Sequence, residues 1–200
     1  MSIRREVEVK LRLEGRAQYE RLCREMGTPE GAWEQVNHYF RSEDGRIPGE
    51  EGVIRLRLEK GRAVFTVKLG ALKDGLADSQ EYEEPWSGPP EMPPSSSRIW
   101  ETGHPGMKAL EQRFGKRFAL VWVGKMVNQR RLYRSDEGLW LEVDASRYPD
   151  GVEDYEVEVE TGDPERDRRR LEALLKRLGI RFVPQTATKY QRFLEHLGRT

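Results

Sequence analysis

Charged and apolar residues alternate with a period of two over several short segments of this chain. Such alternation places one kind of side chain on each face of a β-strand, so it predicts strands with one charged and one apolar face. The clearest segments are residues 6–13, 54–59, 65–69, 139–144 and 155–160. Weaker candidates are residues 80–84, 118–123 and 127–133. Together these segments predict about eight strands.

Helices are predicted between and after the strands. Apolar residues at helical spacing form a stripe on residues 16–26, 164–178 and 190–197, and a glycine follows each stripe. A shorter helix is expected at about residues 105–115. The chain therefore combines strands and helices, with the strands dominant.

A stretch rich in proline and serine interrupts the strand pattern at about residues 85–97. Proline removes a backbone donor and serine favours turns, so this stretch is predicted to be an exposed loop. The strand pattern resumes after it and no segment repeats. Residues 1–200 are therefore interpreted as a single domain that carries this loop and the short helical insert.

The composition excludes several classes of protein. Lys and Arg number 35, as do Asp and Glu, so the formal net charge is zero and a nucleic-acid or membrane-surface partner is not expected. No run approaches the 18 apolar residues of a membrane span, and the charged first ten residues differ from a signal peptide. A cytoplasmic location is expected, and the monomer and the homodimer both remain open.

The charged strand faces allow two interpretations. An antiparallel sheet with one wet face would show the same alternation. The alternative is a closed barrel whose charged faces line the lumen, where like charges would repel unless a ligand neutralised them. Carboxylates suit a hard divalent cation, and Arg and Lys suit phosphate oxygens. A metal ion with a polyphosphate is a ligand that requires both sets together.

Several motifs in order along the chain resemble one family. They are Glu6-x-Glu8-x-Lys10, Asn37-His38-Tyr39-Phe40, Arg55-x-Arg57, Thr66-x-Lys68, Glu81-Tyr82-x-Glu84, Glu142-x-Asp144, Glu156-x-Glu158 and Lys189. In this order and spacing they resemble the CYTH superfamily, the triphosphate tunnel metalloenzymes. The resemblance is greatest to the short bacterial triphosphatase members and extends over nearly the whole chain.

The resemblance implies an α+β fold: a closed eight-stranded antiparallel β-barrel, or tunnel, with a charged lumen and helices packed outside. It implies a triphosphate substrate with Mg²⁺ or Mn²⁺ as cofactor. The implied metal ligands are Glu6, Glu8, Asp144, Glu156 and Glu158. The implied phosphate-binding residues are Lys10, Arg55, Arg57, Lys68, Arg130 and Lys189. Further candidates are Glu81, Glu142 and Arg192.

The family suggests Lys68, helped by Tyr39, as the catalytic residues that activate a water. A lysine in a positive field can serve as a base. The carboxylates compete for this role. His38 neighbours a motif strand but is interpreted as structural, and Cys23 lies on an apolar helix face and is interpreted as core.

The leading hypothesis is an enzyme, a metal-dependent hydrolase of inorganic triphosphate or of a nucleoside triphosphate. The alternatives are a class IV adenylate cyclase, which would share the fold and motifs, and a polyphosphate-binding module without turnover. A Gly-x-x-x-x-Gly-Lys phosphate loop is absent, which excludes a P-loop ATPase. Relatives that hydrolyse thiamine triphosphate carry Trp where this chain has Val53, which disfavours that substrate.

Overall fold

The computed structural model describes residues 2–86, 94–115 and 117–198. Its strands are β1 (Ser2–Leu13), β2 (Gly31–Ser42), β3 (Gly52–Glu59), β4 (Arg62–Lys73), β5 (Leu76–Pro85), β6 (Leu120–Arg134), β7 (Trp140–Arg147), β8 (Glu153–Glu160) and β9 (Phe182–Pro184). Its helices are α1 (Arg16–Met26), α2 (Ser96–Glu101), α3 (Pro105–Phe114), α4 (Pro164–Arg177) and α5 (Lys189–Leu197).

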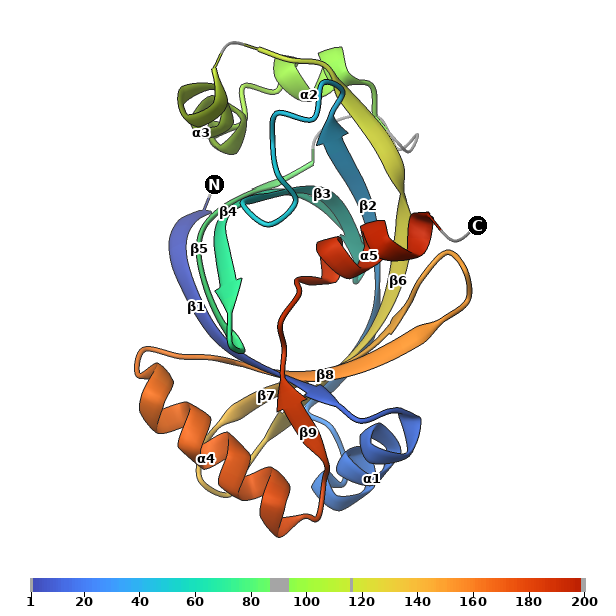
Figure 1. The fold of residues 1–200 in the computed structure, drawn as a ribbon, viewed down its shortest axis with the longest axis vertical. Helices are drawn as coiled ribbons and strands as arrows, with labels where there is room; N and C mark the ends of the chain where they lie inside the picture. Colours follow the sequence, from blue (N-terminus) through green and yellow to red (C-terminus); the bar gives the residue numbers. More distant parts are fainter. Residues whose placement is uncertain (1, 87–93, 116, 199–200) are drawn as a thin grey trace.

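Eight strands form a closed antiparallel barrel. They pair in the order β5-β4-β3-β2-β6-β7-β8-β1, and β1 pairs back to β5 over residues 2–9. Beyond that point β1 turns to β9, which pairs with residues 11–13 outside the barrel. Figure 1 looks into the ring that results. The predicted closed eight-stranded fold is confirmed.

Two predicted strand segments, residues 118–123 and 127–133, fall on one strand, β6, which begins at Leu120, two residues after the start of the first segment. The register between β2 and β6 shifts at Tyr39 and Phe40, opposite Gly124, whose φ is +139°. A bulge inserts a residue and breaks the period of two, so the sequence pattern reads as two strands. In contrast, β2 was not among the alternating segments because its residues 37–40 are buried on both faces.

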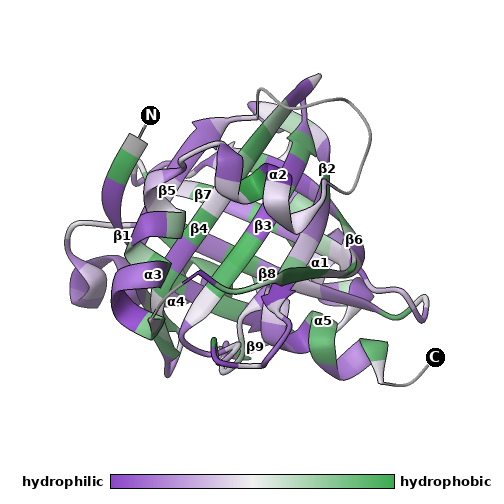
Figure 2. Ribbon diagram, turned by 90° about the horizontal axis from the view of Figure 1, so that it is seen from above, coloured by the Kyte–Doolittle hydropathy of each residue, from purple (hydrophilic) through white to green (hydrophobic). Residues whose placement is uncertain are grey.

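The apolar faces of the strands point outward and pack against helices. Val9 and Val157 belong to a core that α1 and α4 cover, and Leu56 belongs to a second core under α2 and α3. All three side chains are fully buried. Hydrophilic and hydrophobic residues alternate along the strands in Figure 2. The hydrophobic effect therefore fixes which face of each strand is left for the lumen.

The last helix, α5, lies across one opening of the barrel (Figure 1). Tyr190 and Phe193 pack on the lumen-facing Tyr39, with ring centroids 5.1 and 4.9 Å apart. Thr188 caps the helix, and Gln191 returns a side-chain bond to the Thr188 backbone, which fixes where α5 begins. The helix thereby carries its own polar residues into the barrel.

The region predicted as a Pro/Ser-rich loop lies between β5 and α2. Its residues 87–93 lie outside the described residues, and α2 begins at Ser96, inside the range predicted to be a loop. Ser95 caps α2 by accepting a hydrogen bond from the Arg98 backbone N–H. Among the described residues, helices are too short or too polar to cross a membrane.

Candidate active site

The charged strand faces line a cavity of about 290 Å³ inside the barrel. The predicted site residues that line it are Glu6, Glu8, Lys10, Tyr39, Arg55, Arg57, Lys68, Glu81, Arg130, Glu142, Glu156, Glu158 and Lys189. Asp144 and Arg192 do not line it but contact residues that do. The shared period-two phase therefore brings residues from all eight barrel strands and α5 to one place.

One group of three carboxylates is suited to a divalent cation. Glu8 on β1, Glu142 on β7 and Glu158 on β8 each offer an oxygen, and these oxygens lie within 4.8 Å of one another. Glu142 and Glu158 are direct cross-strand partners. Carboxylate oxygens are the ligands that Mg²⁺ and Mn²⁺ prefer. This donor set fits the metal that the sequence implied.

A second group combines Asp144, Glu156 and Glu158. The Lys189 ammonium, which enters from α5, contacts all three carboxylates. Its Nζ lies 2.9 Å from Asp144 Oδ2 and 2.8 Å from Glu158 Oε1, and it also pairs with Glu156. A cation of the chain itself therefore partners these carboxylates.

Glu158 lies at the junction of the two carboxylate groups. Lys10 Nζ lies 2.6 Å from Glu158 Oε1, and Arg130 donates to Oε2 over 2.9 Å. Burial raises the pKa of Glu158, but Lys10, Lys189 and Arg130 more than offset this and hold the pKa well below its usual range. Glu158 is therefore ionised at neutral pH.

Arg130 is the arginine that faces the lumen, and Arg131 faces outward near Tyr19. The Arg130 guanidinium binds Asp144 in a bidentate manner, at 2.9 and 2.6 Å, and also pairs with Glu142. This agrees with the choice of Arg130 made from the sequence. The planar guanidinium links both carboxylate groups.

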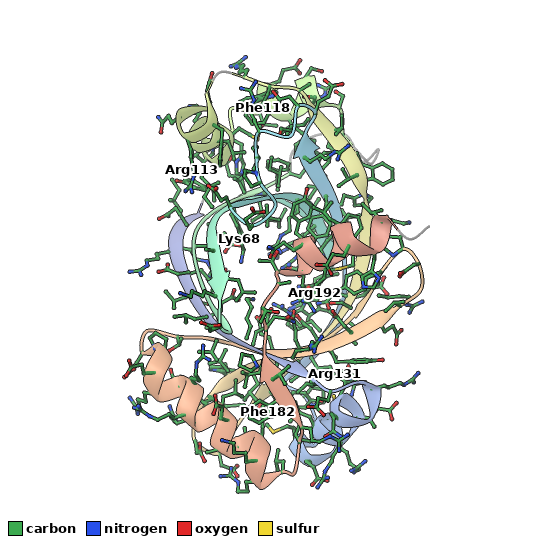
Figure 3. The ribbon with its side chains drawn as sticks, viewed as in Figure 1. Lys68, Arg113, Phe118, Arg131, Phe182 and Arg192 are labelled. Carbon is green, nitrogen blue, oxygen red and sulfur yellow. The ribbon has the colours of Figure 1, made fainter. Side chains whose placement is uncertain are left out.

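Lys68 lies among carboxylates. Its Nζ pairs with Glu6 and lies 3.0 Å from Glu81 Oε1. Glu81, which the sequence could not separate from an exposed edge charge, is buried and also accepts from Arg4 over 3.0 Å. The nearest described contacts of Lys68 are carboxylates, so they do not provide the positive field that would let Lys68 act as a base. Lys68 and Arg192 lie on two sides of the barrel interior in Figure 3.

Two arginines on β3 provide the cationic wall of the cavity. Arg55 lies 3.6 Å from Glu81 and 3.8 Å from Glu83, whereas the Arg57 Nε donates to Asn37 Oδ1 over 2.9 Å. Burial, together with Arg55 and Arg130, lowers the pKa of Arg57 to about 10. Among the described residues Arg57 has no carboxylate within ion-pair distance, so its guanidinium is well placed for an anionic ligand.

Tyr39 and His38 lie on opposite faces of β2. Tyr39 lines the cavity, and burial raises the pKa of its hydroxyl although four cations, including Arg55, oppose this. The hydroxyl therefore stays protonated and can donate a hydrogen bond. His38 packs beside Trp122, with ring centroids 6.2 Å apart, and burial lowers its pKa. Its position outside the cavity agrees with a structural role.

Sequence reasoning missed further polar residues of the cavity, among them Arg4, Gln35 and Glu59, and it named Asn37 in a motif without giving it a role in the site. Arg4 and Glu59 share the period-two phase of their neighbours Glu6 and Arg57, so the same pattern could have found them. Gln35 shares the phase of Asn37 and Tyr39 in the motif, but β2 lacks the alternation that would have drawn attention to it.

Comparisons with known proteins agree with this geometry. The sequence model of the CYTH domain matches residues 4–193. A curated relative, "Putative triphosphatase YjbK" of Bacillus subtilis (strain 168), is 27% identical over 160 residues, which cover 78% of this chain and 75% of that protein.

Solved structures show the same fold. HpAC1 from Hippeastrum, described as a "putative adenylyl cyclase" with a dominant triphosphatase activity, is 27% identical, with a TM-score of 0.83 over 95% of each chain. A "putative adenylate cyclase" from Bacillus halodurans is 26% identical, with a TM-score of 0.72 over 94% of this chain and 98% of that one. Both the family model and these two structures match most of the chain.

Proposed function

The chain belongs to the CYTH family, and from that premise we propose that it is a metal-dependent hydrolase of triphosphates. The observation that carries the proposal is the meeting of buried carboxylates and buried cations in one cavity of about 290 Å³. A triphosphate with a divalent cation presents both charges to such a cavity. The triphosphatase names of YjbK and HpAC1 support the same class of reaction.

In this proposal Arg55, Arg57, Lys10, Lys68, Arg130 and Lys189 bind the phosphate oxygens. Phosphoryl transfer depends on position and charge rather than on covalent chemistry of the protein. Arg57 is the strongest candidate, because its half-buried guanidinium donates to the neutral Asn37 and not to a carboxylate. The other cations exchange a carboxylate partner for a phosphate oxygen when the substrate binds.

Glu8, Glu142 and Glu158 would hold Mg²⁺ or Mn²⁺, with Glu6, Asp144 and Glu156 beside them. When bound, the metal supplies Lewis-acid stabilisation of the charge that develops on the phosphate oxygens. The grouping of Glu8 with Glu158 supports this assignment. Glu6 instead pairs with Arg4 and Lys68, so it lies outside the three carboxylates that would hold the metal.

We assign to a carboxylate the removal of a proton from the attacking water. Burial and the neighbouring Glu8 raise the pKa of Glu6, which makes it a better base than an ordinary glutamate. Lys68, held between Glu6 and Glu81, then contacts the phosphoryl group, and the Tyr39 hydroxyl donates a hydrogen bond. The family resemblance had suggested Lys68, helped by Tyr39, as the base, with the carboxylates as the competitor.

The test is a phosphate-release panel with Mg²⁺, Mn²⁺ or EDTA, across inorganic triphosphate and nucleoside triphosphates, with cyclic AMP measured on the ATP samples. We expect metal-dependent release of phosphate. Cyclic AMP without phosphate release would favour the cyclase named among the structural relatives. Binding of triphosphate without either product would indicate a binding module.

A further inference from the structure

An aromatic residue, Trp33, also lines the cavity, whose cationic wall is formed by Arg55 and Arg57. Trp33 lies on β2 in the phase of Gln35 and Tyr39, two residues from the start of the strand. It is four residues from Asn37, the partner of Arg57, which is about 13 Å along a strand. Trp33 therefore lies near the start of β2, beyond Arg57, and its register partner on β6 is Arg130.

The Trp33 indole is held in place from one edge. Its Nε1 donates to Glu59 Oε2 over 3.2 Å, and Gln35 Nε2 donates to the same oxygen over 2.7 Å. Gln35 is in turn held by Asn128 over 2.9 Å. A ring fixed in this way loses little conformational freedom when a flat ligand stacks on it.

The face of the indole is covered by a side chain that can leave. Lys60 Nζ lies 3.4 Å from the centroid of the Trp33 ring. Lys60 is exposed and lies at the tip of the turn between β3 and β4, where Lys60 and Gly61 have φ values of 49° and 71°. A cation–π contact of an exposed lysine is weaker than stacking of a nucleobase on an aromatic ring. A base can therefore replace the lysine.

Glu59 supplies a polar contact beside the ring. Its Oε2 accepts from Trp33 and Gln35, while Oε1 has no hydrogen-bond partner among the described residues. Burial opposes ionisation, but Arg57 and the two donors lower the pKa of Glu59, so its carboxylate is ionised and only accepts hydrogen bonds. Such a group pairs with an exocyclic amino group or a ring N–H of a base and not with a carbonyl oxygen.

We propose that Trp33 and Glu59 form a nucleobase subsite, so that the tunnel takes a nucleoside triphosphate whose base presents an N–H donor to Glu59. This inference rests on the proposed function for the phosphate end of the ligand. Trp33 stacks on the base, Glu59 accepts from the N–H donor of the base, and the phosphates extend towards Arg57.

The experiment is calorimetric titration of ATP, UTP and inorganic triphosphate in the presence of Mg²⁺. We expect Trp33→Ala to weaken ATP binding about tenfold and to leave inorganic triphosphate unchanged. Trp33→Phe should retain most of the ATP affinity. Glu59→Gln should weaken ATP binding and leave inorganic triphosphate unchanged, because it removes the carboxylate acceptor for the base N–H. Trp140→Ala, at an exposed Trp outside the cavity, is the matched control and should bind all three ligands as the wild type does.

Inorganic triphosphate also reports whether each variant is folded. An equal loss for ATP and inorganic triphosphate in Trp33→Ala, or unchanged ATP binding, would overturn the subsite. A wild-type protein that binds ATP more tightly than inorganic triphosphate yet releases no phosphate would overturn the hydrolase and leave the subsite intact. A wild-type protein that binds none of the three ligands would overturn both.

Discussion

At Glu158 a buried carboxylate meets Lys10, Arg130 and Lys189, all within 2.9 Å. Burying an ion costs several kcal/mol, and the ion pair repays this only when partners surround it. Here the partners are the groups that a triphosphate would contact. The same contacts that stabilise the carboxylate without a ligand therefore compete with the ligand.

Single substitutions should separate metal ligands from phosphate contacts. We expect Glu8→Gln and Lys68→Ala each to lower turnover by at least ~10²-fold, the scale for one preorganised transition-state contact. Raising the metal concentration should partly restore Glu8→Gln, because metal affinity is its main loss. Lys68→Ala should not respond, because its loss is a phosphate contact. Phosphate release against Mg²⁺ concentration measures this, and identical responses would contradict the assignment.

At the scale of elements, alternation predicted β1, β3, β4, β7 and β8, but it left open whether their charged faces meet bulk water or a lumen, and the family resemblance supplied the lumen. It predicted β6 as two separate segments, because the bulge at Gly124 resets the phase. It could not place α5: Lys189 and Arg192 lie off its apolar stripe, as solvated residues would. Only the closure of the barrel reveals that carboxylates of β7 and β8 face this helix.

Arg192 connects α5 to the barrel wall. Its guanidinium pairs with Asp154 and lies 2.7 Å from Glu156 Oε2, and its side chain is 8% exposed. Removing one partner of a buried pair leaves an uncompensated charge, so Arg192→Met should lower the unfolding free energy by about 3 kcal/mol. Urea denaturation measures the loss.

The control for α5 is an exposed arginine on another helix. Arg177 on α4 lies 3.0 Å from Glu137 and its side chain is 54% exposed. Surface ion pairs contribute little, so Arg177→Met should change the unfolding free energy by less than ~1 kcal/mol. Equal effects of the two substitutions would show that Arg192 does not anchor α5.

At the scale of the whole molecule, the formal net charge of zero does not reveal that many charged residues are concentrated in the lumen. The lumen gathers both signs, while the apolar faces and helices form the outer shell. The lumen cations and carboxylates neutralise one another without a ligand. A ligand that binds here must therefore supply both signs at once, because either sign alone leaves part of the lumen without a partner.

Melting temperature with inorganic triphosphate and Mg²⁺, separately and together, tests this most directly. At about a hundredfold excess over Kd, the pair should raise Tm by roughly 5 to 10 °C, more than the sum of the separate shifts. Orthophosphate with Mg²⁺ should raise it far less, because it reaches fewer cations. Shifts that merely add, equal shifts from orthophosphate and triphosphate, or no shift at all would contradict a tunnel that binds triphosphate and metal together.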